Sequence, residues 1–129
     1  MASFKTMETY KAGDILTFEG SNDKHLFILY KGELGIYKGD LLLTVVNERG
    51  AVLGEMGAIL NHPRTATIKA MTDSEVVNME FDIEEIIKNQ PELVIKIVSS
   101  LAERLMNLTE DYRYLMQLTT IENESFFNA

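Results

Sequence analysis

The glycines of this 129-residue chain are unevenly distributed, and their distribution constrains the fold more than any other feature. All eight lie between Gly13 and Gly57, and none follows. Glycine favours tight turns and weakens helix interiors. The chain therefore divides into a turn-rich part that suits short strands and a later part that suits helices.

The turn-rich part contains short apolar segments at regular spacing. Glycine turns at Gly20, Gly32 and Gly39 separate the first four segments. Short strands at regular spacing predict a sandwich or barrel and argue against alternating βαβ units. The predicted strands are Ile15–Phe18, Leu26–Tyr30, Glu33–Tyr37, Leu41–Val46, Ala66–Met71 and Glu75–Phe81.

The hydrophobic period changes at Asp82 from that of strands to that of helices. Asp82 is a suitable N-cap for a short helix that Pro91 ends, and a long helix is predicted from Glu92 to about Ile121, with a loose end beyond it. The length of the chain suits a single core. We therefore expect one mainly β domain over residues 1–129, with a barrel at about 10–81 and two C-terminal helices at about 82–121.

The fourteen residues from Gly54 to Thr67 combine a glycine-bracketed acid, a short apolar helical turn and an arginine after a proline. This combination suits a cyclic phosphodiester, because Arg64 can donate two parallel hydrogen bonds to its single negative charge. Backbone N–H groups at the start of the helical turn can bind the other oxygens. Glu55, which Gly54 allows to come close, can accept a hydrogen bond from a ribose hydroxyl.

This segment resembles the phosphate-binding cassette of the cyclic nucleotide-binding domain family, which includes catabolite-activator regulators, regulatory subunits of cyclic-nucleotide-dependent kinases, and cyclic-nucleotide-gated channels. The resemblance extends over about Tyr10–Leu108, because Tyr10–Leu16 with Glu19–Gly20 is similar to the family's opening strand and turn, and Leu26–Leu34 to its next hairpin. It implies an antiparallel β jelly-roll barrel flanked by helices. The family's usual N-terminal helical segment is expected to be shortened or absent.

The resemblance also implies a site for a cyclic mononucleotide, with cyclic AMP favoured and cyclic GMP possible. Arg64 would hold the phosphate and Glu55 the ribose, although an arginine can also pair with an acid to hold a loop, and a glutamate can be a solvated turn residue. Thr65 could bond the phosphate or a syn guanine. The expected ligand-binding residues are Gly54, Glu55, Met56, Gly57, Ala58, Arg64, Thr65 and Ala66, with Leu108 and Thr109 near the base.

Apolar residues recur along the long helix at alternating steps of four and three, which is a heptad seam. The seam could pack on the chain's own barrel, but further apolar residues lie off it, so the helix has two faces to bury. A parallel homodimer through this helix, as in catabolite-activator relatives, is therefore expected. The seam comprises Val94, Val98, Leu101, Leu105, Leu108, Tyr112, Leu115 and Thr119.

Charge and composition argue against several other functions. The formal net charge of −8 opposes binding of nucleic acid. No segment approaches the roughly 18 apolar residues of a membrane span, so a cytoplasmic location is expected. The chain has no cysteine, and its two histidines, His25 and His62, lack the H-x-H pattern of metal-binding jelly rolls. His62 is expected to be a solvent-facing loop residue.

These patterns predict a stand-alone cyclic-nucleotide sensor that acts through an unidentified downstream protein. No recognition helix fits after Ile121, and no nucleophile–base pair is evident, so we expect neither an enzyme nor a need for a cofactor or metal. An adaptor domain of the same fold that has lost nucleotide binding is the alternative. A metal-dependent jelly-roll enzyme is a more distant third.

Overall fold

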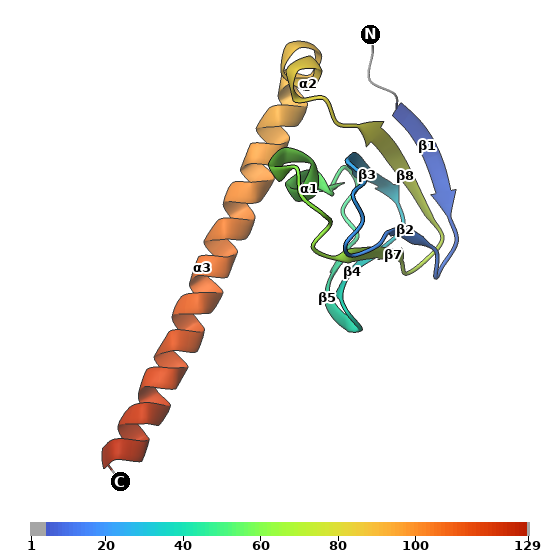
Figure 1. Cartoon of the computed structure of the whole chain (residues 1–129). Helices are drawn as coiled ribbons and strands as arrows, with labels where there is room; N and C mark the ends of the chain where they lie inside the picture. The colour runs from blue at the N-terminus through green and yellow to red at the C-terminus, as the bar shows by residue number, and fades with distance from the viewer. Residues whose placement is uncertain (1–4, 129) are drawn as a thin grey trace. The chain divides into compact units, whose positions relative to one another are not determined.

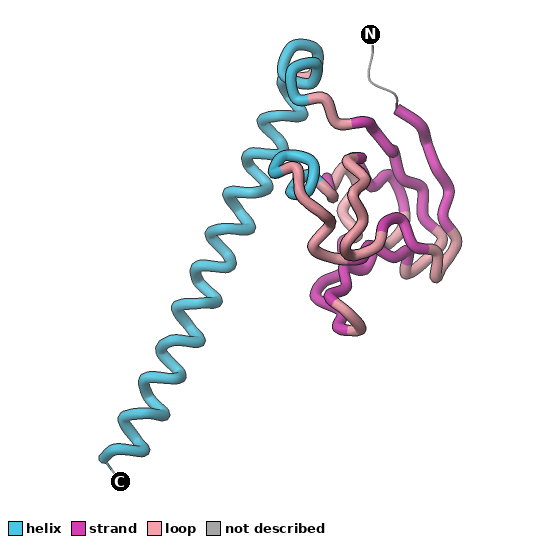
Figure 2. Tube along the Cα trace, in the orientation of Figure 1, coloured by secondary structure: helices cyan, strands magenta, loops and turns pink. Residues whose placement is uncertain are grey.

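A computed structural model describes residues 5–128 of the chain, with side chains described as far as Thr119. The chain forms two compact units, one that ends at Gln90 and one that begins at Pro91 (Figure 1). Eight strands and two short helices make up the described part of the first unit, and a single long helix makes up that of the second (Figure 2).

The strands form two antiparallel four-stranded sheets, whose strand orders are β1-β8-β3-β6 and β2-β7-β4-β5. Along each sheet, strands from early in the sequence lie next to strands from later in the sequence, which is the double-sheet arrangement of a jelly roll. The predicted fold class, mainly antiparallel β with flanking helices, is confirmed. The strands are β1 (Lys5–Tyr10), β2 (Ile15–Thr17), β3 (His25–Lys31), β4 (Leu34–Lys38), β5 (Leu41–Val46), β6 (Val52–Leu53), β7 (Thr67–Ala70) and β8 (Ser74–Glu80).

The sequence prediction missed two of these strands. Strand β1 pairs only with β8 at a sheet edge, and its residues are exposed up to Tyr10, so no alternation of buried and exposed residues marks it in the sequence. Strand β6 has only two residues, which is too short to show a period. The predicted start of the barrel at about residue 10 is therefore corrected to Lys5.

The helices are α1 (Glu55–Leu60), α2 (Ile83–Asn89) and α3 (Pro91–Asn128). The Asp82 side chain caps α2 by accepting hydrogen bonds from the N–H groups of Glu84 and Glu85, as predicted. The predicted end of the long helix at about Ile121 is wrong, because no glycine or proline after Pro91 interrupts the helix. None of the helices over residues 5–128 has the length and apolar character needed to cross a membrane.

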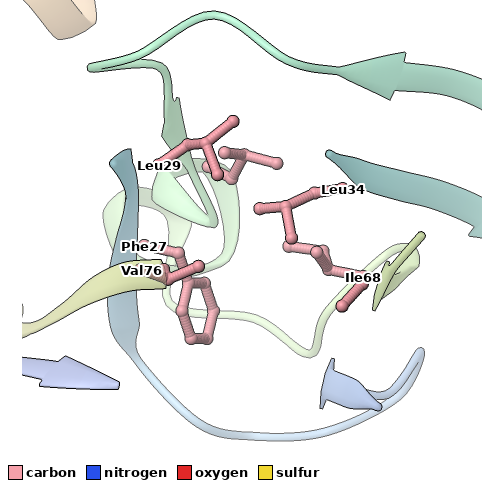
Figure 3. Close-up of a cluster of buried hydrophobic side chains, with 7 residues drawn as sticks. Phe27, Leu29, Leu34, Ile68 and Val76 are labelled. Atoms are coloured by element: carbon pink, nitrogen blue, oxygen red, sulfur yellow. The ribbon is translucent and has the colours of Figure 1, made fainter. Parts of the chain in front are cut away.

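The core of the first unit lies between its two sheets. Phe27, Leu29 and Val76 come from one sheet, and Leu34 and Ile68 come from the other (Figure 3). Leu29 and Val76 are partners across the β3–β8 ladder, so their side chains lie on the same face. This packing fixes the position of the Phe27 ring, which contacts the candidate site.

Candidate functional site

The backbone of Arg64 is fixed to the turn that precedes β3. The Arg64 N–H donates to the carbonyl of Ser21 at 2.8 Å, and the Arg64 carbonyl accepts from the N–H of Gly20 at 2.8 Å. Arg64 lies in the loop between α1 and β7, so two loops that are distant in sequence are joined at this residue. Its side chain therefore starts from a defined point.

The guanidinium of Arg64 is buried and forms hydrogen bonds to three residues. Nε donates to Oδ1 of Asp23 at 3.2 Å, and Nη2 donates to the same oxygen and to the carbonyl of His25, the latter at 2.6 Å. Nη1 donates to the carbonyl of Gly54. The Phe27 ring centroid lies 5.5 Å from Cζ. Four of the five N–H donors of the guanidinium are therefore used.

Asp23 is the residue that sequence reasoning missed. Its Oδ2 accepts hydrogen bonds from the hydroxyls of Thr17 and Ser21, while its Oδ1 faces Arg64. Burial alone would raise the pKa of the Asp23 carboxyl, but the hydrogen bonds from Arg64, Thr17 and Ser21 outweigh burial and hold this pKa well below its usual range. Asp23 is thus ionised at neutral pH and neutralises Arg64. An acid in a polar turn 41 residues away carries no sequence signal for this pairing.

Two glycines of the cassette pack against Arg64. Gly54 has a φ of 85°, and a Cβ there would lie 2.7 Å from Nη1 of Arg64 and 3.0 Å from the carbonyl oxygen of His25. A Cβ at Gly57 would lie 3.6 Å from Cδ of Arg64. Gly54 is therefore required by both its conformation and its close contact.

The other expected site residues take varied positions. Glu55 is the first residue of α1 and is buried, and Ala58 is also buried. Met56 and Thr65 are exposed, and Ala66 is half-buried. The remaining two, Leu108 and Thr109, lie on α3 in the second unit, where both are exposed and the Thr109 hydroxyl donates to the Leu105 carbonyl at 2.8 Å.

Two lysines fix the loop on either side of Arg64. Lys24 Nζ donates to the His62 carbonyl at 3.0 Å, and Lys38 Nζ donates to the Thr65 carbonyl at 2.8 Å. His62 is a half-buried loop residue, and its Nδ1 lies 3.0 Å from the carbonyl oxygen of Pro63. Within the described part of the chain, no group of three or more histidine, aspartate or glutamate side chains could hold a metal ion.

The structure shows one of the two roles that the sequence leaves open for Arg64, the pairing with an acid that holds a loop. The edge formed by Nε and Nη2 is occupied by Asp23, and Nη1 donates to the Gly54 carbonyl. An external anion that binds this edge must therefore replace the carboxylate of Asp23. A bidentate contact with the guanidinium requires the replacement.

Comparison with known proteins identifies the family. The family model for the cyclic nucleotide-binding domain matches residues 7–88, which is more than half of the chain. The chain therefore belongs to the cyclic nucleotide-binding domain family.

Three similar proteins illustrate the range of the family. The chain is 37% identical to the cGMP-dependent protein kinase of Eimeria tenella over 67 residues, and this aligned segment covers 50% of the chain and 6% of the kinase. The catabolite activator protein of Thermus thermophilus has a TM-score of 0.75 at 20% identity, covering 86% of this chain and 55% of that one, which shows the fold alone. The PKAR CBD2 structure with bound Sp-2Cl-cAMPS has a TM-score of 0.57 at 27% identity, covering 76% of this chain and 72% of that one. The chain spans less than a tenth of the length of the curated relatives it matches.

Proposed function

We propose that this chain binds a 3′,5′-cyclic purine mononucleotide and passes its occupancy to a downstream protein. The observation that carries the proposal is the convergence of the cassette on one buried guanidinium: Gly54 and Gly57 contact Arg64, and Glu55 is buried one residue beyond Gly54. Arg64 binds the cyclic phosphate, backbone N–H groups of Gly57 and Ala58 bind its other oxygens, and Glu55 accepts a hydrogen bond from the ribose 2′-hydroxyl.

The phosphate role is tested best in a background that avoids an unpaired aspartate. Arg64→Ala alone would leave Asp23 without its counter-ion, so we compare Asp23→Asn with the double variant Asp23→Asn/Arg64→Ala. The double variant should bind cyclic AMP at least roughly thirtyfold more weakly, because a charged contact in a partly desolvated site is worth about 2–5 kcal/mol. Calorimetry that gives both variants the same affinity would reject Arg64 as the phosphate ligand.

The ribose role has a test that changes the protein and the ligand together. Glu55→Gln keeps the shape of the buried side chain and removes its charge, so it should weaken binding of cyclic AMP by about tenfold, the value of one hydrogen bond to a charged group. It should leave the affinity for 2′-deoxy cyclic AMP almost unchanged. If both ligands lose the same affinity, Glu55 supports the fold of the cassette and does not contact the ribose.

The choice of base remains a separate question. Cyclic AMP is supported by the related domain with a bound cyclic AMP analogue, and cyclic GMP by the relative named as a cGMP-dependent kinase. Thr65 is exposed, so its hydroxyl is available to a syn guanine. Thr65→Ala should lower the ratio of cyclic GMP to cyclic AMP affinity. If the ratio is unchanged, the deciding contact is to be sought at Leu108 and Thr109.

We further propose a homodimer through α3. Its seam residues Val98, Leu105 and Leu115 are all exposed, and so is Met106 off the seam. Leu105→Glu should therefore yield monomers at micromolar concentration and weaken nucleotide binding in step, because ligand binding and dimerisation are reciprocally linked. Glu103→Lys, an exposed polar position, is the matched control. Light scattering that finds the wild type monomeric with and without saturating nucleotide would reject the dimer.

One observation favours the alternative of an adaptor domain without nucleotide binding: Asp23 already occupies the bidentate edge of Arg64. Thermal-shift measurements separate the two functions. A ligand at about one hundred times its Kd stabilises the folded state by about 2.7 kcal/mol, which is a shift of several degrees. No shift with millimolar cyclic AMP or cyclic GMP would support the adaptor.

A further inference from the structure

The side chain of Lys38, the last residue of β4, connects the β4–β5 turn to the cassette. Its Nζ donates to the carbonyl of Thr65 at 2.8 Å and lies 3.2 Å from Oε2 of Glu19. Glu19 lies in the loop between β2 and β3, and Thr65 lies in the loop between α1 and β7, directly after Arg64. The ammonium group is therefore held by partners from two loops, and one of these partners adjoins the proposed phosphate ligand.

Glu19 is itself fixed by further hydrogen bonds. Its Oε1 accepts from the N–H of Gly39 at 3.0 Å, and its own N–H donates to Oγ1 of Thr67 at 2.9 Å. The hydrogen bond from Gly39 and the contact with Lys38 lower the pKa of the Glu19 carboxyl, so this carboxyl is ionised at neutral pH. Lys38 thus pairs with a carboxylate whose position is set by the β4–β5 turn and by the start of β7.

The contact with Lys38 also fixes the backbone that follows Arg64. The N–H and the carbonyl of Arg64 are both bonded to the turn before β3. The next carbonyl, that of Thr65, is bonded to Lys38, and Thr65 forms no other hydrogen bond within residues 5–119. Because the peptide group is planar, holding this carbonyl limits the rotation of the Thr65 backbone. Lys38 therefore restricts the direction of the exposed Thr65 side chain.

We propose that Lys38 is a positioning residue for base preference, which holds Thr65 where its hydroxyl can bond the exocyclic amine of a syn guanine. This inference rests on the proposed cyclic-nucleotide site. The side chains of Lys38 and Glu19 are 56% and 37% exposed, and an exposed ion pair contributes little to stability. A hydroxyl distinguishes two bases only when its direction is restricted, because a hydrogen bond weakens steeply as its angle departs from linear. The loss of Lys38 should therefore affect the choice of base more than the stability of the fold.

The test is a double-mutant cycle in the full chain, in which the wild type, Lys38→Met, Thr65→Ala and the double variant are titrated with cyclic GMP and cyclic AMP by calorimetry. Lys38→Met should lower the ratio of cyclic GMP to cyclic AMP affinity by about threefold to tenfold, the value of one neutral hydrogen bond. In the Thr65→Ala background it should leave the ratio unchanged, because the hydroxyl that Lys38 positions is absent. Lys31→Met, which removes the same charge at an exposed position of β3, is the control and should also leave the ratio unchanged.

Three results with a wild type that binds nucleotide would overturn the role of Lys38 and leave the proposed function standing. The first is an unchanged ratio in Lys38→Met, whether or not both affinities fall together. The second is a change of ratio that persists in the Thr65→Ala background, which would mean that Lys38 does not act through Thr65. The third is the same change of ratio in Lys31→Met, which would mean that the ligand responds only to net charge. A wild type that binds neither nucleotide would instead refute the proposed function, and the role of Lys38 with it.

Discussion

The pairing of Asp23 with Arg64 makes an unusual prediction: Asp23→Asn should destabilise the unliganded chain and at the same time tighten nucleotide binding. In the unliganded chain, Nε and Nη2 of Arg64 both donate to Oδ1 of Asp23. The backbone of Arg64 is held independently of Asp23, through Gly20 and Ser21. The substitution therefore removes the counter-ion of the guanidinium without moving it.

The size of both effects follows from the same contact. Hydrogen bonds to charged groups contribute about 1.5–3 kcal/mol, and the Asp23 side chain is 26% exposed, so we take the lower part of this range, about 1.5–2 kcal/mol. If the phosphate replaces Asp23, the charge left unpaired by Asp23→Asn regains a partner in the complex. The free energy lost by the unliganded chain then reappears as affinity, which corresponds to a gain of roughly tenfold to thirtyfold.

Two measurements that compare the wild type with Asp23→Asn test whether the phosphate replaces Asp23 at Arg64. Urea unfolding at pH 7 gives the change in the free energy of unfolding, and calorimetry with cyclic AMP gives the change in affinity. Lower stability with higher affinity supports an exchange of carboxylate for phosphate at Arg64. Lower stability with weaker binding would refute the exchange, because it would mean that Asp23 holds Arg64 in the geometry that the ligand needs.

Three further predictions concern stability. Because the pKa of Asp23 is lower in the folded chain than its unfolded-state value of 3.8, Asp23 stabilises the fold above that pH, and this stabilisation is lost as the pH falls towards the native pKa. In acid titrations between about pH 4 and pH 2, the stability of the wild type should therefore fall more steeply than that of Asp23→Asn. Gly32→Ala should lower the free energy of unfolding in urea by at least about 3 kcal/mol, because its Cβ would lie 2.7 Å from the Ser74 Cα at a φ of 108°. Gly39→Ala is the control: it has open space around it, so it should lower the free energy of unfolding by about 1–2 kcal/mol. Asp82→Ala removes the α2 cap and should cost about 1 kcal/mol by the same assay, and no change would mean that water satisfies the freed N–H groups.

The sequence predicts the strands that are apolar segments next to glycine turns. Strand β5 has the predicted bounds, Leu41–Val46, and β3 differs from its prediction by one residue at each end. Asp82 marks the start of α2 because a cap is a local interaction. Strand β1 escaped prediction because its pairing with β8 is decided by residues about 70 positions later, and a polar edge strand carries no period of its own.

The candidate site was predictable to a similar extent. The close contact of Gly54 with Arg64 agrees with the local reason for glycine at that position, which is the need for backbone to approach closely, whereas a Cβ at Gly57 would lie nearest the carbonyl oxygen of His62, at 3.2 Å. Asp23 was not predictable, because its role depends on bringing the turn before β3 against the loop before β7. A pairing between two loops depends on the topology of both sheets, and no spacing within either loop encodes it.

This pairing bears on how the proposed ligand would signal. Asp23 connects Arg64 to the hydroxyls of Thr17 and Ser21, so the buried guanidinium is joined to the end of β2 and to the turn before β3. On the proposed function, a phosphate that replaces Asp23 breaks this connection while the backbone bonds between Arg64 and Ser21 remain. The side chain of Asp23 must then find a new position between two strands of different sheets. The first structural response to the ligand is therefore expected at residues 17–23, outside the cassette that binds it.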